Sequence, residues 1–165
     1  GSAAELAGLL LADGAREQHV RTLVEHRAPH TRSDQLYRGV AAGRGRGSYD
    51  GKVVVHAGSA QAESRQSSRN LLLGREAGFE SRPQLEINAD DVKCSHGATT
   101  GTLDEQMLFY LLARGLDRET ARALLTYAFV GDVLRRLAPE ALRRAAEARV
   151  LGRLPAADLL REFVA

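Results

Sequence analysis

The sequence has little net charge, a single cysteine and no long apolar run. Its 23 Lys and Arg residues against 21 Asp and Glu leave a formal charge of +2 over 165 residues, which gives no reason to expect a nucleic-acid or anionic-membrane partner. Cys94 is the only cysteine, which excludes an internal disulfide framework and is compatible with a cytoplasmic location. No apolar stretch approaches the roughly 20 residues that a membrane helix needs, and the start carries no secretory signal.

The first residue is not Met, and Gly1-Ser2 resembles a cloning remnant, so we expect the chain to be a piece of a longer protein. The chain also lacks the G-x-G-x-x-G and G-x-x-x-x-G-K-[ST] fingerprints, so we expect it to hold no nucleotide. The stretch 44–47, Arg-Gly-Arg-Gly, resembles a basic loop, but no aromatic residues are interleaved with it, so nucleic-acid binding has weak support. Hydrophobic residues make up 44% of the chain, which is enough to bury a core.

Composition changes near Gly101, because twelve of the 16 glycines and all five histidines lie in residues 1–100. We therefore expect two domains, 1–101 and 102–165. Short β-favouring stretches recur in the first domain, with no segment between them long enough for a crossover helix. They include Val53-Val54-Val55, Leu71-Leu72-Leu73 and Leu85-Glu86-Ile87. This pattern predicts an all-β stack, either a loose β-solenoid or a sandwich of hairpins, and the irregular spacing does not choose between them.

Turn signals separate these stretches. Ala12-Asp13-Gly14 and Asp50-Gly51 are both predicted to be turns. The polar run Gln66-Ser67-Ser68-Arg69-Asn70 has two interpretations. We favour a solvated turn, but in a solenoid the same residues could stack in ladders while Val, Leu and Ile side chains fill the interior.

After Gly101 the apolar residues recur at helical spacing, which predicts four helices. Their start and stop signals are, in chain order, a capping box Thr102-Leu103-Asp104-Glu105, Gly115 as a stop, Asp117 as a cap, Pro139 in a first turn, and Pro155 before a short last helix ending in Phe163. The apolar stripe of the second helix is expected to continue to Leu137. The charged face of Arg135, Arg136, Arg143 and Arg144 is interpreted as solvated, with partner docking as the alternative.

Candidate chemistry centres on Cys94 and His96. They are two residues apart, so on a strand both side chains lie on the same face, where thiolate and imidazole could bind zinc, copper or iron. Two ligands do not close a metal site, so we expect no metal site within this chain alone. Two other interpretations of these residues stay open. One is a Cys–His nucleophilic pair, and the other is a structural pair made of a buried thiol and a hydrogen-bonded histidine.

A self-contained metalloenzyme would need a third ligand, for which His26, His30 and His56 are the candidates. His26 and His30 have the i, i+4 spacing that suits a metal-binding helix. Pro29 disfavours a helix between them, so a pair of loop histidines is the better prediction.

Several ordered blocks of the chain resemble the SufB/SufD family, and its SufD branch in particular. The blocks are 24–30 and 36–40, 66–73, 82–87 and 89–99, 103–105 and 108–111, and the resemblance covers roughly residues 5–150. SufB-type chains carry a functional cysteine where this sequence has Ser68 or its neighbours, which favours SufD over SufB.

The resemblance implies a mainly β protein with α, in which a partial right-handed parallel β-helix precedes a C-terminal helical domain. It implies a non-catalytic scaffold subunit of the SUF iron–sulfur cluster assembly complex. Such a subunit would pair with SufB through the β-helix and with the ATPase SufC through the helices between Leu103 and Leu137.

His96, with Cys94 beside it, matches the SufD histidine that is proposed to face the nascent cluster at the SufB contact, so a transient iron–sulfur cluster would be shared with SufB. The open end of a cut β-helix could also pair with a second copy of the chain, which leaves a homodimer open. The alternative function is a self-contained metal-binding enzyme that uses His96 and Cys94.

Overall fold

The structure is a computed structural model that describes residues 1–154, 156 and 158–160. The chain divides into two compact units, Gly1–Thr100 and Gly101–Ala165, and each is described by itself.

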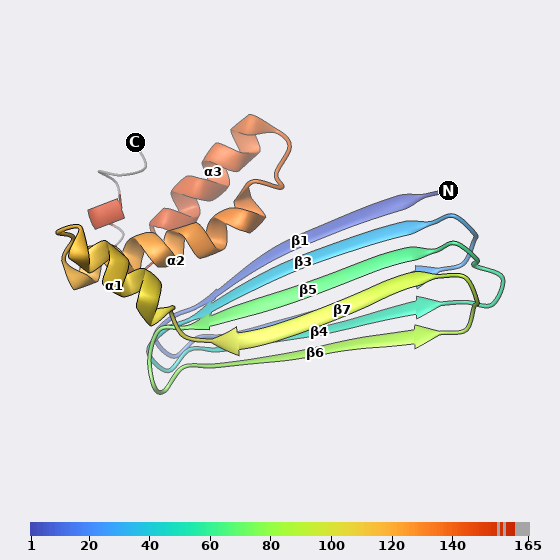
Figure 1. Ribbon diagram of the computed structural model, residues 1–165, viewed down its shortest axis with the longest axis horizontal. Helices are drawn as coiled ribbons and strands as arrows, with labels where there is room; N and C mark the ends of the chain where they lie inside the picture. The colour runs from blue at the N-terminus through green and yellow to red at the C-terminus, as the bar shows by residue number, and fades with distance from the viewer. Residues whose placement is uncertain (155, 157, 161–165) are drawn as a thin grey trace. The chain divides into compact units, whose positions relative to one another are not determined.

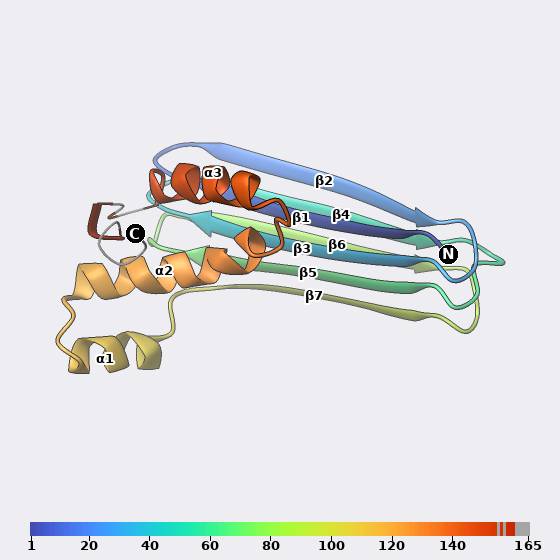
Figure 2. The ribbon, with the colours of Figure 1, turned by 90° about the horizontal axis from the view of Figure 1, so that it is seen from above.

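Residues 1–100 fold into long strands that run side by side in two layers (Figures 1 and 2). The strands are β1 (Ala3–Ala12), β2 (Glu17–His26), β3 (Arg32–Ala41), β4 (Arg46–Val55), β5 (Glu63–Leu72), β6 (Gly78–Ile87) and β7 (Lys93–Gly101). One sheet has the order β1-β3-β5-β7 and the other the order β2-β4-β6. The chain therefore crosses from one sheet to the other after every strand.

Strands that neighbour each other within a sheet run parallel, as between β1 and β3 or β4 and β6. In the first sheet Ala3 lies beside Arg32, and Arg32 lies beside Glu63. Each turn of the chain thus stacks on the previous one after about 30 residues, which is a β-solenoid. The solenoid prediction is confirmed over the sandwich of hairpins, because hairpins would pair neighbouring strands antiparallel.

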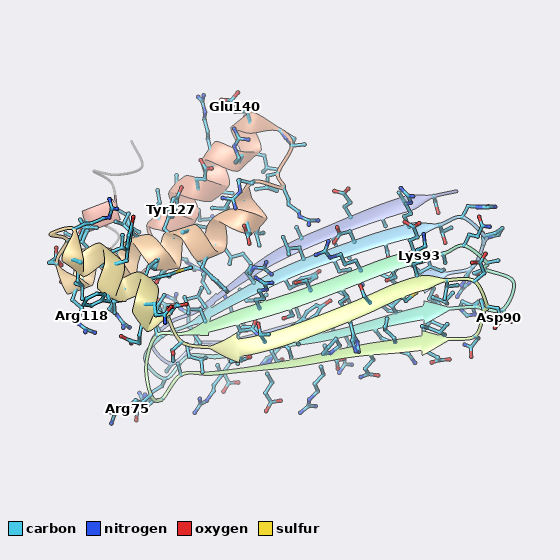
Figure 3. All side chains as sticks on the ribbon, viewed as in Figure 1. Arg75, Asp90, Lys93, Arg118, Tyr127 and Glu140 are labelled. Atoms are coloured by element: carbon cyan, nitrogen blue, oxygen red, sulfur yellow. The ribbon has the colours of Figure 1, made fainter. Side chains whose placement is uncertain are left out.

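The turns of the solenoid lie at its two ends. Figure 3 shows Arg75, between β5 and β6, and Asp90, between β6 and β7, at opposite ends of the strands. The turn predicted at Ala12-Asp13-Gly14 is confirmed, because β1 ends at Ala12 and Gly14 has a positive φ of 62°. In such a backbone conformation glycine is free of the steric cost that other residues carry.

Two other turn predictions are wrong. Asp50-Gly51 lies inside β4, and the polar run Gln66–Asn70 lies inside β5. Gly51 faces the interior, where a Cβ atom would fall 2.2 Å from the amide nitrogen of Gln66. The glycine thus makes room for a neighbouring side chain rather than for a turn.

The β-favouring runs are confirmed as strand except at Leu73, which follows the end of β5, and each forms only the last part of a ten-residue strand. Two apolar clusters fill the interior between the sheets. The first contains Leu10, Tyr37, Tyr49 and Phe79, and the second contains Val53, Val55 and Ala62. The Tyr37 and Tyr49 rings stack with their centroids 4.2 Å apart.

The second unit contains α1 (Glu105–Ala113), α2 (Arg118–Leu134) and α3 (Glu140–Leu151). Asp117 caps α2 as predicted, accepting from the amides of Glu119 and Thr120. The capping box predicted at Thr102 is wrong: Asp104 caps α1, because its carboxylate accepts from two amides of the first turn.

Gly115 follows the end of α1 with φ of 90°, which confirms the predicted stop. Leu137 lies beyond the end of α2, so the stripe predicted to reach it ends earlier. The fourth helix predicted between Pro155 and Phe163 falls largely outside the described residues. None of the helices formed by the described residues is both long and apolar enough to span a membrane.

Candidate functional site

β7 is the last strand of the solenoid and forms one edge of its sheet, beside β5. The Lys93 amide donates to the Ala62 carbonyl at 2.9 Å. At the other end of the strand, Asn70 donates to the Thr100 hydroxyl, 30 residues away in sequence, at 3.1 Å. Both bonds fit one parallel register, in which a residue of β7 lies beside the residue that precedes it by 30 in β5.

This register places Cys94 beside Ser64 and His96 beside Gln66. Ser64 and Gln66 are buried and point into the solenoid, since they alternate along β5 with more exposed positions. Cys94 and His96 both lie on β7, two residues apart. Their side chains therefore share the interior face of the last strand, at the open end of the stack.

Cys94 is half-buried and packs against the cluster of Val53, Val55 and Ala62. Burial raises the pKa of its thiol, and this effect exceeds the lowering by a backbone hydrogen bond from Ser64. The thiol is therefore protonated at neutral pH. Since iron binds the thiolate, coordination at Cys94 would release a proton.

His96 is solvent-exposed on the same face. Its imidazole makes no hydrogen bond to any residue of the described ranges 1–154, 156 and 158–160. Both ring nitrogens are thus available, one as a ligand and the other as a donor.

A buried polar network lies directly below His96 in the stack. The Tyr49 hydroxyl donates to Gln35 Oε1 at 3.1 Å and accepts from Gln66 Nε2 at 3.0 Å. Thr22 also donates to Gln35 Oε1, at 3.0 Å. Gln35 and Gln66 lie beside each other in register, so the network joins four strands, β2 to β5, across the interior.

Two atoms of this network have no partner among the described residues: Gln35 Nε2 and Gln66 Oε1. Both side chains are buried, with Gln35 0% and Gln66 2% exposed. Buried amide atoms are nearly always hydrogen-bonded, so these two are unusual.

The network was missed by the sequence analysis, which favoured a solvated turn for residues 66–70. Residues 66–70 are all polar, so the sequence carries no alternation of polar and apolar residues that would mark Gln66, Ser68 and Asn70 as interior. All three are buried, and Ser68 and Asn70 both contact Ser81 across the interior, at 2.8 and 2.9 Å. The solenoid ladder, given as the alternative, is therefore correct.

His26 is the last residue of β2 and is 3% exposed, so the prediction of a loop position is wrong for it. Its Nδ1 lies 2.7 Å from the Thr31 hydroxyl and its Nε2 lies 2.9 Å from the Ser33 hydroxyl. Burial lowers its pKa. With both nitrogens hydrogen-bonded, His26 has none free for a metal.

The other two candidate ligands lie apart from His96. His30 has a positive φ of 58° in the turn between β2 and β3, and His56 follows β4 and pairs with Glu25 at 3.0 Å. Within the described part of the chain, no three His, Cys, Asp or Glu side chains gather in a way that could hold a metal ion. The structure thus gives the metalloenzyme hypothesis no third ligand beside Cys94 and His96.

The helical unit carries exposed apolar side chains on α1. Met107, Phe109 and Tyr110 are 58%, 72% and 55% exposed, whereas Leu108 between them is fully buried. The Arg114 guanidinium lies over the Tyr110 ring, 4.2 Å from its centroid. Exposed aromatic residues grouped on one helix are typical of protein–protein contacts.

The arginine-rich face behaves differently. Arg135 pairs with Asp132, Arg144 pairs with Glu140, and Arg143 lies 3.9 Å from Glu147. These exposed ion pairs lie within or beside single helices. Their arrangement agrees with the solvated interpretation of this face.

Comparison with known proteins identifies a family. The family model described as "SUF system FeS cluster assembly, SufBD core domain" matches residues 1–129. The iron-sulfur cluster assembly protein SufD of Escherichia coli (strain K12) is 38% identical over 135 residues, which cover 82% of this chain and 32% of that protein. Protein ABCI7, chloroplastic, of Arabidopsis thaliana is 39% identical over 137 residues, covering 82% of this chain and 28% of that protein.

An iron-sulfur cluster assembly SufBD family protein of Mycobacterium leprae is 34% identical over 151 residues, covering 87% of this chain and 38% of that protein. The chain thus spans about a third of the length of these relatives. The family model covers the whole solenoid and extends through α1 into α2. The chain belongs to the SufBD family of SUF-system iron–sulfur cluster assembly proteins.

Proposed function

We propose that this chain is the part of a non-catalytic, cytoplasmic scaffold subunit that presents Cys94 and His96 to a nascent iron–sulfur cluster. The cluster is the cargo of the assembly, held transiently and shared with a SufB-type partner. The observation that carries this proposal is the position of both side chains on the interior face of the edge strand β7. Imidazole and thiolate are both ligands for iron in such clusters.

The partner would complete the site at the open end of the solenoid. Among the strands that the described residues form, β7 has β5 on one side only, so its other edge offers backbone groups to a further strand. A SufB-type protein that docks at this end would bring its own ligands close to Cys94 and His96. Because the partner would supply the remaining ligands of the cluster, two candidate ligands in this chain are enough.

The test is cluster formation in an assembly of this chain with SufB and SufC, purified without oxygen. We expect His96→Ala to lower the iron and acid-labile sulfide per complex severalfold. His19→Ala is the matched control, because His19 is equally a histidine in a strand but lies beside Ser48 on the exposed side of β2. Circular dichroism checks that both variants keep the strand content. Equal cluster content in the two variants would remove His96 from the site.

We also propose that the helices between Leu103 and Leu137 dock the ATPase SufC. The exposed aromatic side chains of α1 support this, since a soluble partner with an apolar groove would cover them. Phe109→Ala, at the most exposed of these positions, is expected to weaken SufC binding at least tenfold in calorimetric titration. Leu142→Ala is the control, because Leu142 is 53% exposed on α3, outside the proposed surface. Identical affinities for the two variants would contradict the assignment to α1.

A further inference from the structure

Gln66 carries a buried carbonyl oxygen that no described residue satisfies, and His96 lies beside it on the next strand. Gln66 is 2% exposed, and its Oε1 has no hydrogen-bond partner among the described residues. The register of β5 and β7 brings His96 next to it. An acceptor without a donor thus lies next to an imidazole that makes no hydrogen bond in the described structure.

The orientation of the Gln66 amide follows from its neighbours. The Tyr49 hydroxyl has one proton, which it donates to Gln35 Oε1 at 3.1 Å. With that proton donated to Gln35, Tyr49 accepts from Gln66 Nε2 at 3.0 Å. Gly51 leaves space for that nitrogen, since a Cβ there would lie 2.2 Å from it.

The amide nitrogen is thus directed from β5 toward β4, which belongs to the preceding turn of the solenoid. The oxygen is the free end of the same group. Of the neighbouring turns, the following one contributes His96, whose ring always carries at least one N–H donor.

We propose that Gln66 is a positioning residue for His96: its Oε1 accepts a hydrogen bond from one ring N–H and so holds the imidazole in one tautomer. The other ring nitrogen then keeps its lone pair and is presented as a ligand. That this lone pair binds the iron of a nascent cluster rests on the proposed function. The hydrogen bond between Gln66 and His96 does not depend on that function.

Gln35 Nε2 is the rival donor, because it is also without a partner and Gln35 lies beside Gln66 in register. If the two amides satisfied each other, His96 would be free to adopt both neutral tautomers. The tautomer of His96 therefore decides between the two arrangements.

The experiment measures ring nitrogen chemical shifts of the five histidines by long-range ¹H–¹⁵N correlation in this 165-residue chain, at mildly alkaline pH. His96→Gln assigns the His96 signals by their loss. We expect His96 in the wild type to show a single dominant tautomer.

Gln66→Met keeps the side-chain volume and removes the acceptor, and it is expected to shift His96 to the tautomer mixture of a free imidazole. Gln66→Glu retains an acceptor at the same position and is expected to restore the single tautomer. Ser68→Ala is the matched control, since Ser68 is the next interior position of β5 and contacts Ser81 instead. It should leave His96 unchanged.

A tautomer mixture at His96 in the wild type would overturn the proposal, and this measurement needs no change at Gln66, only the His96→Gln variant for the signal assignment. An unchanged single tautomer in Gln66→Met would overturn it as well. Neither measurement needs iron or a partner protein. A loss of cluster formation with the tautomer intact would therefore count against the proposed function and not against the role of Gln66.

Discussion

Removing the Tyr49 hydroxyl tests whether the buried polar network holds the solenoid together. Tyr49 is 1% exposed, and its hydroxyl connects Gln35 and Gln66. In Tyr49→Phe, Gln35 Oε1 keeps its bond from Thr22, but Gln66 Nε2 loses the acceptor that it has among the described residues. The ring still fills the same space and keeps its stacking on Tyr37.

The expected loss of stability follows from the hydrogen bonds that this substitution removes. A buried polar group left without a partner costs about 1–3 kcal/mol. One amide nitrogen is orphaned and one acceptor loses one of two donors, so we expect the free energy of unfolding of the solenoid to fall by about 2 kcal/mol. Because about 1.4 kcal/mol changes an equilibrium constant tenfold, the constant for opening β4 and β5 would rise about 30-fold. Exchange of the amides that requires this opening would accelerate by the same factor.

Hydrogen exchange measured by mass spectrometry separates this effect from the helical unit, because peptides of β4 and β5 can be compared with peptides of α2. Tyr37→Phe is the matched control. Its ring belongs to the same stack, but its hydroxyl makes no hydrogen bond among the described residues, so we expect a change within about 0.5 kcal/mol. Equal effects of the two substitutions would refute the argument that the hydrogen bonds, rather than the ring, carry the stability.

Two further predictions concern the interior. Burial lowers the pKa of His26 below the ordinary 6.5, so the unfolded chain binds more protons just below that pH, and the free energy of unfolding falls as the pH drops from 6.5 toward the folded pKa. Urea unfolding above and below pH 6.5 should show a smaller pH effect in His26→Asn, and an undiminished effect would contradict this assignment. In Gly47→Ala the new Cβ would lie 2.2 Å from the Phe79 ring, which is expected to cost about 1–3 kcal/mol. Gly97→Ala, where no atom lies within 4 Å, should change the urea midpoint little, and equal shifts for the two glycines would contradict the packing argument.

The candidate site was only half predictable from the sequence. Cys94 and His96 could be found, because their spacing is local and the surrounding block resembles a known family. Gln35, Tyr49 and Gln66 could not, since they are 14 to 31 residues apart and belong to three strands. Polar residues in a short window favour a solvated turn, and only the stacking of turns reveals that they face the interior.

By itself, the sequence determined what depends on neighbouring residues and on family resemblance. It distinguished a β part from a helical part, it identified the Asp117 cap and the Gly115 stop, and it indicated the SufB/SufD family. Each of these features is decided within a few residues or by ordered blocks, so no knowledge of spatial neighbours is needed.

Only the tertiary structure decided which strands pair, in which direction and in which register. Solenoid and hairpin sandwich have the same local alternation, and the two differ only in contacts between residues about 30 positions apart. Those contacts also decided that Gly51 leaves space for Gln66 and that Gln66 lies under His96. The physical reason is that side-chain burial in a strand depends on its partners in space, which a local pattern does not contain.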